Sequence, residues 1–208
     1  MSIATFQELQ DAVANWLDRS DLSDRIPEFI SLAEARINRN LRVRAMEKRY
    51  TANTVSGQRV YALPTDYVQM RSLRLNQDPI VSLQYLSPTN MDSVWAGSAS
   101  GTPTAYTIVA NEIRLGPSPD SVIEMEINYY RKVTPLSGTN TTEVLLTENP
   151  DLYLYGALMQ AEPFLMNDER IALWGSLFDK TIQELESQDA RDRASGSTLT
   201  IRNLGENP

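Results

Sequence analysis

Two carboxylates two positions apart are the most suggestive chemical pair in the sequence. Glu124 and Glu126 lie where apolar and polar residues alternate, so a strand would place both on one face, about 6 to 7 Å apart. That separation is near the one that inverting glycoside hydrolases use. Nothing around the pair suggests the apolar pocket that would raise one pKa. We therefore interpret the pair as a solvated sheet face, with a cell-wall glycan hydrolase as an alternative function.

The residue types that most often carry catalysis are missing. The 208 residues include no His and no Cys, which excludes thiolate metal sites, Cys nucleophiles and the commonest general base. The adjacent acids Asp168 and Glu169 are better explained as first-turn residues that complement a helix dipole. We expect no enzyme, and no metal or cofactor.

Charge is distributed unevenly along the chain. The net charge is -8, yet residues 36–49 carry six basic side chains and one acidic one, and residues 143–193 carry eleven acids and four bases. These two segments could pair between copies of the chain or with an oppositely charged partner. A nucleic-acid-binding module remains a second alternative, although duplex binders are usually basic overall.

Targeting and membrane segments are not expected. The N-terminus lacks the basic stretch and apolar run of a signal peptide, and no run of about 18 apolar residues occurs. We expect a protein with no membrane contact.

Helices are predicted at both ends of the chain. Thr5 and Glu8 form a capping box for a first helix that ends near Arg19, and a second helix begins after Ser23 and continues to Leu41. Two more helices are predicted from Asn149 to Met166 and from Asn167 to about residue 193. The helix at 152–166 is apolar almost all round, so we expect a neighbouring subunit to cover part of it.

The middle of the chain has the composition of a β domain. Between Lys48 and Lys132 it is rich in Tyr, Val, Ile and Thr, with turn residues at short intervals. A short helix is predicted at 89–95. The fold prediction is therefore α+β: a four-helix bundle from the N- and C-terminal helices, a central antiparallel β domain and an extended C-terminal tail. The expected segments are 1–47, 48–142, 143–193 and 194–208.

Several strings in a fixed order resemble a known family. They are AEARINRNLRVRAMEKR, YALPTDYVQMRSL, LSPTNMDSVWAGSASGTPTAYTI, RLGPSPD, EINYYRKVTPLS and NPDLYLYGAL. Together they make the chain, over roughly residues 5–195, similar to the head-to-tail adaptors of short-tailed bacteriophages, also called tail tubular protein A or portal-bound tail accessory factors. No single string is a chemical motif.

The resemblance implies a structural virion protein at the head-tail junction, made in the bacterial host cytoplasm. It implies a ring of twelve copies between the portal protein and the tail nozzle protein, through which DNA passes without sequence-specific binding. An acidic chain suits such a conduit, because it repels phosphate. Candidate subunit or partner contacts are Arg36, Arg39, Arg42, Arg44, Leu199 and Ile201. The last two belong to the tail, whose strand-like residues we expect to dock on a neighbour or on the portal.

Overall fold

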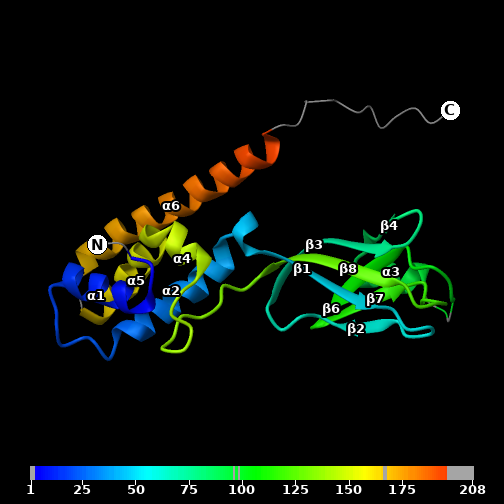
Figure 1. Ribbon diagram of the computed structural model, residues 1–208, viewed down its shortest axis with the longest axis horizontal. Helices are drawn as coiled ribbons and strands as arrows, with labels where there is room; N and C mark the ends of the chain where they lie inside the picture. The colour runs from blue at the N-terminus through cyan, green and yellow to red at the C-terminus, as the bar shows by residue number, and fades with distance from the viewer. Residues whose placement is uncertain (1–2, 96, 98, 166–167, 196–208) are drawn as a thin grey trace. The chain divides into compact units, whose positions relative to one another are not determined.

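The computed structural model describes residues 3–95, 97, 99–165 and 168–195. The chain divides into two compact units (Figure 1): residues 1–44 with 135–208, and residues 45–134. We call the first the helical unit and the second the β unit. The predicted α+β class is confirmed, since helices and sheets are both present.

The helical unit contains five α-helices in its described part. They are α1 (Phe6–Leu17), α2 (Ile26–Asn40), α4 (Val144–Glu148), α5 (Pro150–Leu165) and α6 (Asp168–Ala194). The predicted capping box forms at the start of α1: the Glu8 amide donates to Thr5 Oγ1, and Glu8 Oε2 accepts from the Thr5 amide. The sequence analysis missed α4, because its five residues are too few to show a helical pattern of apolar positions.

Helix α5 is the centre of the helical unit, in contact with α1, α2, α4 and α6. Most of its apolar side chains, including those of Leu152 and Leu158, are buried, whereas Phe164 near its end is 52% exposed. Helices of the same chain supply most of the cover that the sequence analysis had expected in part from a neighbouring subunit. Pro163 lies in the last turn of the helix, which continues to Leu165. Helices α2 and α6 can both pack closely on α5 because α5 carries Gly156, where an added Cβ would lie 3.0 to 3.1 Å from Ala33 and Phe178.

The β unit consists of two four-stranded sheets. Sheet A has the strand order β1-β8-β3-β4, and sheet B has the order β2-β7-β6-β5. The strands are β1 (Glu47–Asn53), β2 (Val60–Ala62), β3 (Tyr67–Asn76), β4 (Val81–Ser82), β5 (Gln84–Tyr85), β6 (Ala105–Val109), β7 (Glu112–Gly116) and β8 (Glu124–Arg131). The 3-10 helix η1 (Arg44–Met46) precedes β1, and α3 (Pro88–Val94) confirms the short helix predicted in this region.

The β unit is not purely antiparallel, although the sequence analysis predicted an antiparallel β domain. Strands β5 and β6 are parallel, so sheet B is mixed, whereas the other pairs are antiparallel. Strands β1 and β2 flank the turn at Gly57 but belong to different sheets. Composition predicts strands well, but it does not specify partners that are distant in the sequence.

One hydrophobic core lies between the two sheets. It includes Leu73 from β3, Ile127 and Tyr129 from β8, Tyr106 from β6 and Leu115 from β7. Because side chains alternate along a strand, the residues between these positions lie on the outer faces of the sheets. The contacts of Arg71 and Glu126 described below lie on the outer face of sheet A.

Candidate interface

The Arg residues predicted to form an interface lie at the end of α2 and just after it. Arg36, on α2, has its guanidinium 5.4 Å from the ring centre of Phe178 and 3.5 Å from Asp179 Oδ1, both on α6. This contact joins the basic segment to the acidic helix within one chain. The ring and the half-buried guanidinium form a cation-π contact, which is stronger where water is partly excluded.

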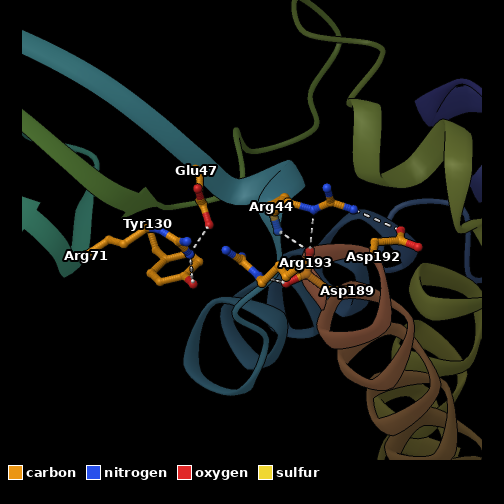
Figure 2. Close-up of polar contacts among 7 residues, drawn as sticks. All are labelled: Arg44, Glu47, Arg71, Tyr130, Asp189, Asp192 and Arg193. Atoms are coloured by element: carbon orange, nitrogen blue, oxygen red, sulfur yellow. Dashed lines mark hydrogen bonds and ion pairs between the residues drawn. The ribbon is translucent and has the colours of Figure 1, made fainter. Parts of the chain in front are cut away.

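Arg44 makes the most complete polar contact between the two segments (Figure 2). Its amide and its Nε both donate to Asp189 Oδ1, at 3.1 and 2.9 Å, and its Nη2 donates to Asp192 Oδ2 at 2.9 Å. Arg193 donates to the second oxygen of Asp189 at 2.5 Å. Burial opposes the charge of Asp189, but the hydrogen bonds from Arg193 and Arg44 outweigh it and lower its pKa.

The other two predicted Arg residues differ from each other. The Nη1 of Arg42 donates to the carbonyl oxygens of Asn38 and Leu41, so it caps the end of α2. Arg39 is exposed, and among the side chains of residues 3–95, 97, 99–165 and 170–195 it has no ion-pair partner. It is therefore the member of the set with a cationic group available to a partner.

The remaining basic residues of the segment belong to the β unit. Lys48 lies 2.8 Å from Asp66, which also accepts a 2.7 Å hydrogen bond from the hydroxyl of Tyr129. Burial and the nearby Asp66 carboxylate raise the pKa of Tyr129, so the hydroxyl remains a donor. These contacts fix the strand β1 against the loop before β3.

A second polar group lies on the outer face of sheet A. Arg71 Nη1 is 2.6 Å from Glu47 Oε1 and 3.3 Å from the hydroxyl of Tyr130 (Figure 2). These residues come from β3, β1 and β8, three strands that pair side by side. The sequence analysis did not identify this group, because its members are up to 83 positions apart and share no motif.

The carboxylate pair on β8 lacks the properties of a glycosidase site. Glu126 is 4% exposed and lies 2.8 Å from Arg74 and 3.9 Å from Arg49, so the prediction of a solvated face is wrong at this position. Burial opposes its charge, but the hydrogen bonds from Arg74 and Asn128 outweigh that effect and lower its pKa. A general acid needs a raised pKa. Glu124 accepts a 2.6 Å hydrogen bond from Asn76.

Other classes of site receive no support in the described part of the chain. No group of three acidic side chains that could hold a metal occurs there. No described helix has the length and apolar character needed to cross a bilayer. The predicted tail contacts Leu199 and Ile201 lie outside the described residues.

A comparison with protein families identifies the family of the chain. The family model of the SU10 adaptor protein matches residues 4–202. The chain belongs to the SU10 adaptor family. The resemblance to head-to-tail adaptors is thereby confirmed at the level of the family. A search of curated proteins finds no match.

Family membership indicates which polar residues matter for function. An SU10 adaptor is a phage structural protein and not an enzyme. Its surface must hold other proteins, so exposed and unpaired charges on a well-packed unit matter more than a catalytic pair. Arg39 meets that description, whereas Arg36 and Arg44 already have acidic partners in the same chain.

Proposed function

We propose that this SU10 adaptor is the subunit of a ring, of twelve copies, that joins the portal to the tail nozzle in the virion. The family match over residues 4–202 is the observation that carries the proposal. In this arrangement the helical units pack side by side as a bundle, the β units face the tail, and DNA passes through the centre. The net charge of -8 favours passage over binding, since the chain repels phosphate.

Ring contacts of this kind are head-to-tail, so each copy needs two different surfaces. We assign Arg39 to one of them, with Arg36, Arg42 and Arg44 beside it on the same segment. The acidic residues 143–193 supply the opposite charge for a neighbour, although Asp179, Asp189 and Asp192 are engaged by Arg36 and Arg44 within the chain. The salt-dependent part of the contact therefore depends on Arg39 and on acids other than these three.

The C-terminal segment 195–208 is proposed to attach the ring to the portal, through Leu199 and Ile201. These apolar residues alternate with Thr198 and Thr200, a pattern suited to strand addition. Helix α6 ends at Ala194, directly before this segment.

The experiment is a reconstitution with purified adaptor and purified portal. Native mass spectrometry gives the copy number of the adaptor alone and on the portal, and cryo-electron microscopy of the complex locates the ring. We expect twelve copies on the portal. A stable monomer that leaves the portal unoccupied at micromolar concentration would exclude the proposed function.

A further inference from the structure

Two side chains with enclosed polar atoms lie on the outer face of sheet B. Thr107 on β6 and Arg114 on β7 are direct cross-strand partners. The neighbouring core residues Tyr106, Ile113 and Leu115 point to the other face, so Thr107 and Arg114 share the outer one. Thr107 is 1% exposed, and among the described residues neither its Oγ1 nor the Nε of Arg114, both enclosed, has a hydrogen-bond partner.

Trp95 and Arg59 complete the group. The next pair along the same face is Ala105 and Gly116, and a Cβ on Gly116 would lie 2.5 Å from Cδ1 of Trp95. The indole therefore lies directly on the sheet. Arg59 donates from Nε to the Leu115 carbonyl and from Nη1 to the Trp95 carbonyl. Its Nη2 and the indole Nε1 are enclosed and have no partner in the part of the chain that the structure describes.

These atoms have one chemistry in common. The set comprises three enclosed N–H donors and one hydroxyl, from sheet B and from the segments bonded to it. Two of the donors belong to guanidinium groups, and no described acidic side chain pairs with either Arg. An enclosed donor without an acceptor destabilises the folded state, so folded proteins rarely keep several in one place. An oxyanion would satisfy them, because planar guanidinium groups match carboxylate oxygens in pairs.

The surroundings favour a protein carboxylate over a nucleic-acid phosphate. Val60, opposite Arg114 on β2, is 37% exposed, and Val94, before Trp95, is 59% exposed. Apolar side chains beside a cationic group fit an acidic residue that has apolar neighbours. The donors are too enclosed for a duplex backbone, and the chain is acidic overall. Arg114 is half-buried, so part of its side chain faces solvent.

We propose that Arg59, Trp95, Thr107 and Arg114 form a site for the carboxylate side chain of a partner protein. The site lies within the β unit alone. It goes beyond the adaptor role and does not depend on ring formation or on the C-terminal segment.

Nuclear magnetic resonance of the full-length, ¹⁵N-labelled protein tests the site directly. The indole N–H of Trp95 reports occupancy, and those of Trp16 and Trp174 in the helical unit are internal references. The probes, at low ionic strength, are the capped peptide Val-Glu-Val, its matched control Val-Gln-Val, inorganic phosphate and a short single-stranded oligonucleotide. We expect a saturable shift of the Trp95 signal with the Glu peptide alone.

Variants connect the signal to the site. Arg114→Gln should weaken peptide binding at least about tenfold, whereas Arg39→Gln, which removes the same charge from the helical unit, should not change it. Thr107→Val keeps the shape of a side chain whose hydroxyl has no partner among the described residues. This variant should fold normally and bind the peptide more weakly. It replaces R114Q as the test if R114Q unfolds.

Three results would overturn the proposal. The first is an unmoved Trp95 signal with the Glu peptide, and the second is an equal shift with the Gln peptide. The third is a shift with phosphate or the oligonucleotide only, which would reassign the donors to phosphate. Each result is obtained on the free protein, so a failure here leaves the ring proposal standing, and a monomeric adaptor would leave this site standing.

Discussion

The Nε of Arg44 donates a 2.9 Å hydrogen bond to Oδ1 of Asp189, although 145 positions separate the two residues. Through this bond the segment that follows α2 holds the last turns of α6, most of whose side chains are exposed after Ile182. The opposite charges of the two segments meet here inside one chain.

Removal of the Asp189 carboxylate should loosen the end of α6. In Asp189→Asn, Arg44 and Arg193 lose a charged acceptor that is 11% exposed, and we expect a loss of about 1 kcal/mol, since Arg44 is half exposed and screened. The measurements are denaturant unfolding and hydrogen exchange of residues 185–194. Asp192→Asn is the control, because that carboxylate is 49% exposed and should contribute less. Equal losses in the two variants would refute this role for Asp189.

Assembly should respond differently to two charge reversals. Arg39→Glu should weaken ring formation and leave the free energy of unfolding unchanged, because Arg39 has no ion pair in the described residues. Arg44→Glu should weaken assembly and also destabilise the monomer, because it places a carboxylate beside Asp189 and Asp192. Mass photometry at increasing NaCl measures ring formation, and urea unfolding measures the free energy of unfolding of the monomer. Normal assembly of R39E across all salt concentrations would remove this residue from the interface.

Glu34 should make stability depend on pH near neutrality. Its carboxylate, 5% exposed on α2, accepts a 2.8 Å hydrogen bond from the Leu136 amide. Burial raises its pKa from 4.5 to about 7; the Leu136 hydrogen bond opposes the rise, and the charge of Glu143 adds to it. Between these two values the folded protein holds a proton that the unfolded chain releases, so this contribution to stability is complete below pH 4.5 and is lost as pH rises through 7.

The matched variant for this effect is Glu34→Gln, which keeps an acceptor for Leu136 and cannot ionise. The difference between the pKa of Glu34 in the folded protein and in the unfolded chain corresponds to at most about 3 kcal/mol of stability. We expect about 2 kcal/mol after solvent screening. Urea unfolding at pH 5 and pH 8 should show wild type losing more stability than the variant by that amount. Parallel losses in both proteins would show that Glu34 ionises as an ordinary carboxylate.

Gly116 should tolerate no side chain. A methyl group there would lie 2.5 Å from Trp95 and 2.8 Å from Met91, so Gly116→Ala should cost about 1–3 kcal/mol by displacing α3 from sheet B. Gly138→Ala is the control, because its Cβ would meet no atom within 4 Å. Thermal unfolding checks the difference, and an unchanged midpoint for G116A would mean that the indole moves aside freely.

Deletion of residues 195–208 should weaken attachment to the portal without affecting folding. The segment follows the last residue of α6, so its removal should leave the unfolding midpoint nearly unchanged and weaken binding to the portal. Co-sedimentation of the truncated adaptor with portal rings measures the second effect. Full binding, or unfolding of the truncated chain, would show that the segment is not the docking element.

The sequence by itself determined the class of fold and the family. Capping residues and helical periodicity placed α1, α2 and α5 to within a few residues, because these signals are local. Alternation and turn residues identified the β unit for the same reason. The order of several strings indicated the adaptor family, which the family model over residues 4–202 confirms.

Only the tertiary structure decided which residues meet. Arg44 with Asp189, Glu126 with Arg74, and Trp95 with Gly116 join segments distant in the sequence or on different elements, and the sequence marks none of these pairs. Whether the basic segment pairs within its own chain, and whether a polar residue on a strand is solvated or enclosed, depends on how sheets and helices pack. Packing is a property of the whole unit, so local patterns cannot specify it.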